Sequence, residues 1–105
     1  MRRKPKYTVD EIRQRVAPVA RRYGVKHVFL FGSYARDEAR AKSDVDLLID
    51  DPENKIKGLF ALGGLYCDLE EALGAKIDLF TTDALSEKFS NRIRKEEVLL
   101  YAEGA

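Results

Sequence analysis

The sequence has very little of the residues that build disulfide frameworks, zinc sites and histidine-based catalysis. Its 105 residues include one cysteine, one histidine and no tryptophan. The single cysteine, Cys67, excludes an internal disulfide and a cysteine-rich metal site, and its place in an apolar pattern predicts a small buried side chain. His27 opens an apolar strand, so we expect a structural role there, with a general base as the less favoured alternative.

Long apolar runs and an excess of one charge are also missing. No apolar run approaches the roughly 18 residues of a membrane span, and the opening MRRKPKY lacks the apolar stretch of a signal peptide. We therefore expect a cytoplasmic protein without membrane contact. The net charge of +1 provides no general attraction to nucleic acid, which is not expected as the main partner.

Basic residues do gather early in the chain. We interpret them as a solvated face in preference to a phosphate-binding patch, because runs of like charge are most often simply hydrated. A DNA-binding role for them is the weakest alternative, since no helix-turn-helix pattern accompanies them. These residues are Arg2, Arg3, Lys4, Lys6, Arg13, Arg15, Arg21 and Arg22.

The composition that is present describes one folded domain. Hydrophobic residues make up 45% of the chain and charged residues 35%, which excludes the disordered and membrane classes. A chain of 105 residues can bury one core but not two, so we expect a single domain over residues 1–105.

Helical patterns come with recognisable ends. Thr8 and Glu11 form a capping box before the first apolar stripe, which ends at Gly24. The second stripe is closed by Gly74 and contains Gly63-Gly64, which predicts a kink or a close approach by another backbone. The predicted helices cover 9–23, a short stretch from Tyr34 to about Ala39, 56–73, and a last region that begins at Asp83 or Ser86.

Short runs rich in β-branched and aromatic residues predict strands at 27–31, 44–50 and 76–80. A fourth run, VLLY near the end, is ambiguous between helix and strand. The order helix, strand, short helix, strand, long helix, strand, helix indicates an α/β fold, with a mixed β-sheet flanked by helices.

Two aspartates lie one residue apart in the strand DVDLLID. Successive strand residues point to opposite faces, so Asp44 and Asp46 share a face, roughly 6 to 7 Å apart at ~3.3 Å per residue. Like charges at that distance repel, and burying them is costly unless a cation lies between them. Mg²⁺ prefers oxygen ligands and keeps several waters, so two carboxylates and substrate phosphates can complete its shell.

Asp78 interrupts the strand KIDLF as Asp46 interrupts its own. If the two strands are neighbours, three carboxylates can converge on one or two Mg²⁺ ions, and a two-metal site is the expectation. A solvent-facing strand aspartate is the ordinary explanation for any one of these residues, but it becomes rare for all three together.

Gly32-Ser33 lies between a strand end and the predicted helix at Tyr34. Glycine permits a tight turn and a close approach to a ligand, and serine offers a hydroxyl and an N–H group. A phosphate at a helix N-terminus meets free amides and the positive end of the helix dipole. Arg36 is a further candidate phosphate contact.

The segments GSYAR, SDVDLLID and KIDLF resemble the nucleotidyltransferase superfamily that includes DNA polymerase beta and kanamycin nucleotidyltransferase. More closely, the chain resembles the minimal nucleotidyltransferases (MNT or MntA-like), small proteins often paired with a HEPN-domain toxin. The resemblance covers the chain from the first helix through Tyr101, and it implies the small nucleotidyltransferase fold.

The resemblance also implies roles for the matching residues. Gly32 and Ser33 would hold the triphosphate of ATP, Asp44 and Asp46 would ligate Mg²⁺, and Asp78 would be the third acid, assisting deprotonation of the acceptor hydroxyl. Antitoxin members of the family transfer AMP from ATP to a tyrosine of the partner toxin. The implied function is therefore that of a protein adenylyltransferase acting as the antitoxin of a toxin-antitoxin pair.

The chain departs from the family at Asp37, where many relatives have glycine. Aspartate adopts left-handed backbone conformations better than most residues, so the turn should survive, with an added negative charge near the triphosphate. A chain of this length cannot enclose both substrates, so we expect a homo- or hetero-oligomer to complete the pocket. The alternative functions are an antitoxin that neutralises its partner by binding alone and a nucleotide-sensing regulatory module.

Overall fold

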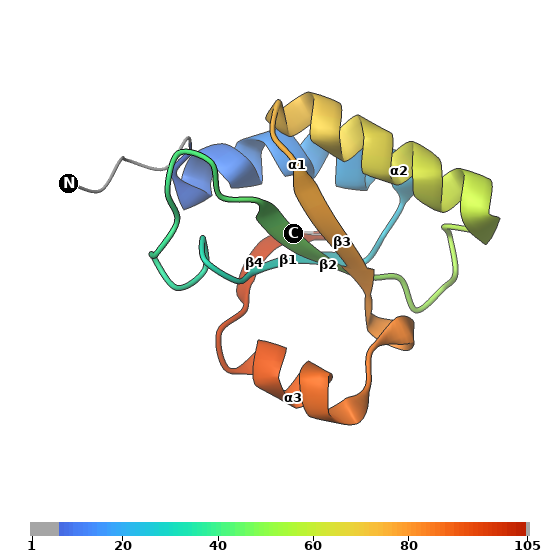
Figure 1. Cartoon of the computed structure of the whole chain (residues 1–105). Coiled ribbons are helices and arrows are strands. Elements are labelled where there is room, and N and C mark those ends of the chain that lie inside the picture. The colour runs from blue at the N-terminus through green and yellow to red at the C-terminus, as the bar shows by residue number, and fades with distance from the viewer. Residues whose placement is uncertain (1–6, 105) are drawn as a thin grey trace.

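Four strands form one mixed sheet with helices on both faces (Figure 1). The computed structural model describes residues 7–104, so the basic residues at positions 2, 3, 4 and 6 lie outside the described part of the chain. The elements are α1 (Val9–Tyr23), β1 (His27–Phe31), β2 (Val45–Asp50), α2 (Gly58–Leu73), β3 (Ile77–Thr81), the 3₁₀ turn η1 (Thr82–Ala84), α3 (Glu87–Arg94) and β4 (Val98–Ala102).

The strand order in the sheet is β3-β2-β1-β4. β1 runs antiparallel to both β2 and β4, whereas β2 and β3 are parallel and α2 makes the crossover between them. The predicted α/β class with a mixed sheet is therefore confirmed.

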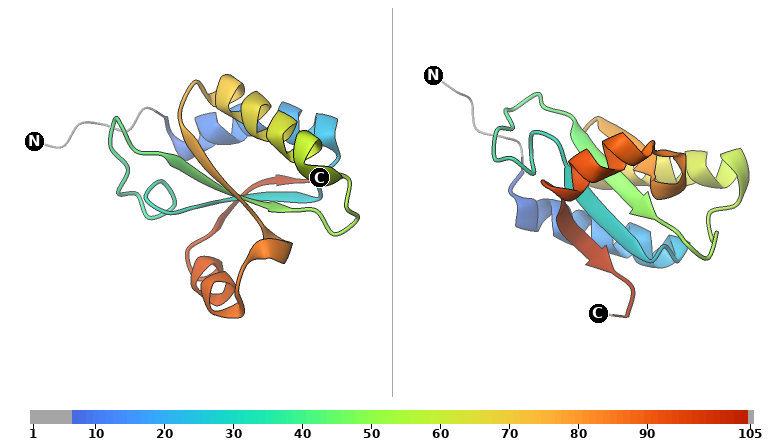
Figure 2. Two further views of the ribbon diagram at one scale, coloured as in Figure 1. Left: turned by 45° about the vertical axis from the view of Figure 1, so that its right-hand side comes forward. Right: turned by 90° about the horizontal axis from the view of Figure 1, so that it is seen from below.

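The two faces of the sheet are covered unequally. α1 and α2 lie side by side on one face, and α3 lies alone on the other (Figures 1 and 2). Strand alternation divides the core accordingly: Val45, Leu47 and Ile49 join the large cluster under α1 and α2, while Leu48 joins Phe31 in a small cluster with α3. The even-numbered residues of β2 therefore face α3.

Most of the predicted helix ends are confirmed, but α2 begins at Gly58 and not at the predicted position 56. The Thr8 hydroxyl accepts from the Glu11 N–H at 3.1 Å, and the Glu11 carboxylate accepts from the Thr8 N–H at 3.1 Å, which completes the capping box. Gly24, with φ 76°, ends α1 in the left-handed region, and Gly74 ends α2 in the same way. Ser86, not Asp83, caps α3 by accepting from the Phe89 N–H.

One glycine of the pair in α2 has a close neighbour, although not of the predicted kind. A Cβ atom at Gly64 would lie 3.0 Å from the hydroxyl of Tyr23, so α1 and α2 approach closely here. The neighbour is a side chain, whereas the sequence suggested a backbone. The Tyr23 hydroxyl donates to Asp68 at 2.6 Å, which holds it in this position.

Packing decides two further points. The prediction that Cys67 is buried is wrong: α2 buries Leu65, Leu69 and Leu73, and Cys67 is exposed because a residue two positions from this stripe lies on the other side of the helix. The ambiguous run VLLY is a strand, since β4 pairs with β1.

Within residues 7–104, none of the helices combines the length and apolar character required to cross a bilayer.

Candidate active site

Asp46 and Asp78 lie side by side on paired strands. The parallel register of β2 and β3 makes them direct partners, so their side chains share the face of the sheet that α3 covers. Asp46 is half-buried, Asp78 is exposed, and Asp78 acts on the pKa of Asp46 through hydrogen bonding and charge. The condition set by the sequence, that the two strands be neighbours, is thus met.

Asp44 lies one residue before the first residue of β2, whose predicted start at position 44 was one residue early. It is half-buried and close enough for its charge to act on Asp46. Asp44 and Asp78 therefore both lie near enough to act on Asp46, but among residues 7–104 the three carboxylates do not converge into one metal-binding group as the sequence suggested.

This crowding changes the chemistry of the Asp46 carboxyl. Burial, the hydrogen bond to Asp78 and the charges of Asp78 and Asp44 raise the pKa of Asp46 to about 6, from an ordinary value of 3.8, and Arg36 partly opposes them. A cation at this point would relieve the repulsion.

The carboxylate set suits Mg²⁺ bound together with a substrate. Among residues 7–104, no three or more histidine, cysteine, aspartate or glutamate side chains form a group that could hold a metal ion by itself. Mg²⁺ commonly uses one or two carboxylates and takes its remaining oxygen ligands from phosphates and water. The acids around Asp46 fit that use better than they fit a closed structural metal site.

The raised pKa predicts that Asp46→Asn stabilises the metal-free protein. The folded state holds the Asp46 proton more tightly than the unfolded state, so this group's stabilising contribution is full below pH 4 and is lost as the pH rises through about 6. At pH 7.5 in EDTA, we expect the variant to be more stable by roughly 1 to 3 kcal/mol. Thermal unfolding should show this difference shrink towards pH 4.

The exposed Asp83 provides the control for this measurement, because Asp83→Asn should shift stability little at either pH. A variant at position 46 that was less stable than the wild type at pH 7.5 would contradict the prediction.

Gly32 follows directly after β1 and lies against Asp46. The antiparallel register pairs Phe31 with Asp46, which brings the next residue beside the carboxylate. Gly32 has φ 75°, and a Cβ atom there would overlap the Asp46 carboxylate, with the Asp46 Cγ only 2.9 Å away. The glycine is therefore required both by its backbone conformation and by this close approach.

The segment after Gly32 is a tight turn, and the predicted helix from Tyr34 to Ala39 is wrong. Gly32 and Asp37, with φ 75° and 59°, are both in the left-handed region. They lie at the two ends of the segment, so only one turn fits between them. The Arg36 N–H donates to the Gly32 carbonyl at 3.1 Å, and the Glu38 N–H donates to the Ser33 carbonyl at 2.8 Å. An anion here would meet turn amides and the Ser33 hydroxyl, without a helix dipole.

Asp37 accommodates the left-handed conformation that the sequence predicted for it. Its side chain is exposed. Aspartate at this position therefore leaves the turn intact.

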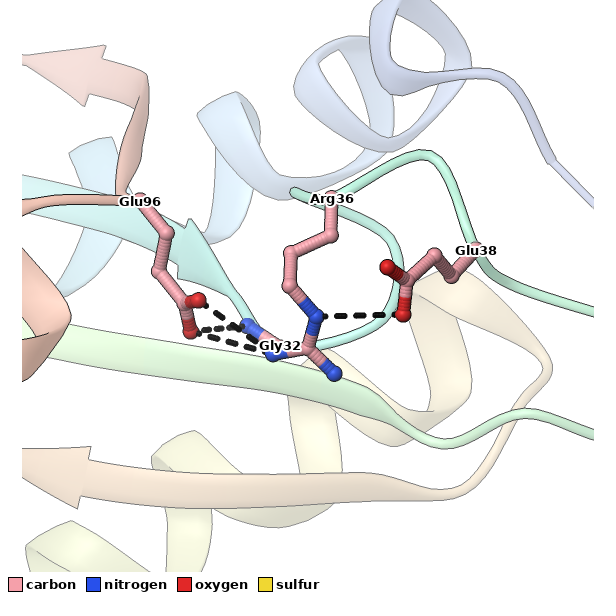
Figure 3. A network of polar contacts seen from close by, with 4 residues as sticks. All are labelled: Gly32, Arg36, Glu38 and Glu96. Carbon is pink, nitrogen blue, oxygen red and sulfur yellow. Dashed lines mark hydrogen bonds and ion pairs between the residues drawn. The ribbon is translucent and has the colours of Figure 1, made fainter.

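A residue that the sequence did not single out, Glu96, contacts this turn (Figure 3). Its carboxylate accepts from the Gly32 N–H at 3.3 Å and from Arg36 Nη1 at 3.3 Å. Arg36 also donates through Nε to Glu38 at 3.3 Å. The hydrogen bond to Glu96, followed by that to Glu38, raises the pKa of the Arg36 guanidinium.

Four of the predicted residues line one cavity of about 310 Å³, together with residues from the α3 side of the molecule. Asp44 and Asp78 are not among its lining residues and lie beside it, next to Asp46. Arg92 is a second arginine at this cavity, which sequence reasoning missed. The lining residues are Phe31, Gly32, Ser33, Arg36, Asp46, Phe89, Arg92, Ile93 and Glu96.

His27 does not belong to this site. It starts β1, whereas Gly32 follows the end of that strand, and its Nδ1 lies 2.9 Å from an Asp50 carboxylate oxygen. The structural role expected for His27 is consistent with this pairing. A larger hollow of about 740 Å³ lies where β2 ends, around Ile49 and Asp50. None of the predicted site residues line it.

Neighbouring strand carboxylates beside a glycine-serine turn, on a small mixed sheet, are typical of nucleotidyltransferases. Residues 14–104 match the family described as polymerase beta, nucleotidyltransferase. The chain belongs to this family and to its class of enzymes, as the resemblance of its motifs indicated.

The similar proteins place it among the minimal, MntA-like members. A Methanocaldococcus jannaschii protein described as a candidate protein adenylyltransferase is 37% identical over 90 residues, covering 86% of this chain and 95% of the relative. Protein adenylyltransferase MntA of Thermococcus cleftensis is 38% identical over 77 residues, covering 73% of this chain and 76% of the relative.

A solved structure supports the fold. It is described as the tri-AMPylated HEPN toxin of Shewanella oneidensis in complex with an MNT antitoxin. One of its chains superimposes with a TM-score of 0.66 at 18% identity, covering 87% of this chain and 70% of that one. At this identity the likeness concerns the fold alone.

Proposed function

We propose that this protein transfers AMP from ATP to a hydroxyl group of a protein partner, namely a tyrosine of a HEPN-domain toxin, and so acts as an antitoxin. The observation that carries the proposal is the pairing of Asp46 with Asp78 beside the Gly32 turn. It is supported by identities of 37% and 38% to proteins described as adenylyltransferases.

In the proposed mechanism, Gly32, Ser33 and Arg36 bind phosphate oxygens of ATP through the amide, the hydroxyl and the guanidinium. Asp44 and Asp46 would hold Mg²⁺, which would supply positive charge to offset the charge that builds up on the phosphates during transfer. The carboxylates must be ionised to bind it, so binding should strengthen as the pH rises through the pKa of Asp46.

Asp78 is proposed as the proton acceptor. The acceptor oxygen forms a bond to the α-phosphorus of ATP, the bond from that phosphorus to the β-phosphate oxygen breaks, and pyrophosphate leaves. The hydroxyl proton passes to the Asp78 carboxylate. Asp78 is exposed, so a hydroxyl carried by another protein can approach it, which fits a pocket completed by a partner.

The test is a transfer assay with purified components. The protein, ATP labelled on the α-phosphate, Mg²⁺ and the HEPN-domain product of a neighbouring gene are incubated together. We expect label on the HEPN protein, AMP on a tyrosine by peptide mass spectrometry, and no label in EDTA. Label that is absent, or that appears equally in EDTA, would contradict the proposal.

The second candidate is an antitoxin that acts by contact alone. It is favoured by one observation: the Gly32 amide and Arg36 are already bound to Glu96. In that case the HEPN protein would bind and lose its toxicity without acquiring AMP.

A further inference from the structure

The polar groups proposed to bind phosphate already hold an anion from the protein itself. The Gly32 N–H and the Arg36 guanidinium both donate to the Glu96 carboxylate. A carboxylate and a phosphate present the same feature to such donors, namely negatively charged oxygens. Glu96 therefore takes the place that a phosphate of the nucleotide would need (Figure 3).

The position of Glu96 is set by its backbone. It lies between α3 and β4, where its N–H donates to the Ile93 carbonyl at 3.0 Å and the Glu97 N–H donates to the same carbonyl at 2.9 Å. Ile93 is itself buried in the cluster under α3. The turn thus directs the Glu96 side chain, which is only 25% exposed, towards the cavity.

The contacts are suited to exchange. Each of the three donor-to-oxygen distances is 3.3 Å, which is slightly beyond the usual 2.7 to ~3.2 Å of an N–H···O bond. Hydrogen bonds of this length are weak, and a phosphate bearing more charge than a carboxylate competes well for the same donors. Asp46 lines the same cavity, so the displaced carboxylate would also leave a crowded negative region.

We propose that Glu96 is an internal competitor of the nucleotide: its carboxylate occupies the proposed phosphate-binding groups and must leave before ATP binds. This inference rests on the proposed function, because it assigns Gly32 and Arg36 to phosphate binding. It makes Glu96 a residue that sets nucleotide affinity. If Glu96 merely positioned Arg36, its removal would weaken nucleotide binding and not strengthen it.

The test compares Glu96→Gln with the wild type by calorimetry, using Mg²⁺-ATP, inorganic tripolyphosphate and adenosine as ligands. Loss of the competing charge should lower the dissociation constants for ATP and tripolyphosphate by roughly three- to tenfold. Adenosine, which has no phosphate, should bind both proteins equally. Glu96→Ala removes the remaining acceptor oxygen and should bind the two phosphate ligands at least as tightly as Glu96→Gln.

Glu38→Gln is the matched control. It removes the same charge from the same arginine, but the Glu38 carboxylate contacts Arg36 Nε, not the Gly32 amide. We expect a clearly smaller gain in affinity for this variant. An equal gain would mean that general electrostatics suffices, and it would overturn the proposal.

Unchanged or weaker phosphate binding by Glu96→Gln would also overturn the proposal, as would the absence of binding by all the proteins. The proposed function fails separately. Tighter phosphate binding by Glu96→Gln, with no transfer of AMP to the HEPN protein, would support the competitor and contradict the transferase.

Discussion

Replacing Asp44 and Asp46 together by asparagine is expected to reduce AMP transfer at least about a thousandfold, because a bound metal contributes several kcal/mol to such reactions. Asp46 lies in β2 against Gly32, and Asp44 lies one residue before this strand. Asparagine keeps their shape but removes the charge that is proposed to hold Mg²⁺. Label transfer to the HEPN protein at saturating ATP measures the effect.

Two measurements make this result interpretable. The variant should remain folded, and at pH 7.5 without metal it should be at least as stable as the wild type, since Asp46 carries a pKa raised to about 6. Asp83→Asn, outside the site, should transfer AMP normally. If the double variant transferred AMP at a rate within tenfold of the wild type, the assignment of Asp44 and Asp46 as metal ligands would be wrong.

The double variant also separates the two candidate functions. An antitoxin that depends on AMP transfer should lose its protection of growing cells when Asp44 and Asp46 are replaced. An antitoxin that acts by contact should protect fully, because the exposed surface of the molecule is otherwise unchanged. Co-expression with the HEPN protein distinguishes these outcomes directly.

Gly32→Ala should have the second largest effect. The backbone there has φ 75°, and the new methyl group would overlap the Asp46 carboxylate. Left-handed strain alone costs roughly 1 to 3 kcal/mol, and relieving the overlap must move either the turn or Asp46. We expect a lower unfolding temperature and loss of measurable ATP binding.

Gly58→Ala provides a matched control. Gly58 has φ 77°, but a Cβ atom there would meet nothing within 4 Å. This variant should therefore show the strain without the overlap, with a lower unfolding temperature and normal ATP binding. If Gly32→Ala bound ATP as Gly58→Ala does, the close approach of Gly32 to Asp46 would not matter for the nucleotide.

The local pattern predicts the helix caps correctly, because short-range chemistry decides them. The capping box of Thr8 and Glu11 and the glycine ends of α1 and α2 depend on residues within four positions of one another. Strand alternation likewise placed Asp46 on the face opposite Val45 and Leu47. These features follow from hydrogen-bonding and steric rules that act along the chain.

The wrong predictions concern segments where contacts with distant parts of the chain override the local sequence pattern. A helix at Tyr34 was plausible locally, but Tyr34 is buried in the main core and Asp37 is left-handed, so only one turn fits. Cys67 belongs to a helix with apolar residues on several sides, and only the packing of α2 on the sheet decided that Leu65 and Leu69 would be inside.

Glu96 illustrates the same limit for the site. It belongs to no motif and lies 64 residues from Gly32 along the chain. A single glutamate in a charged segment carries no signal that distinguishes it from its neighbour Glu97. Only the approach of the α3–β4 turn to the end of β1 brought it to the cavity.

The sequence by itself determined that this chain carries a glycine-serine turn, two aspartates one residue apart and a third aspartate in another strand, because these are properties of adjacent residues. The tertiary structure alone decided that Asp78 lies beside Asp46 and that Glu96 holds the Gly32 amide. The register of β2 with β3 and the docking of α3 are set by burial of the whole core, which no local pattern encodes.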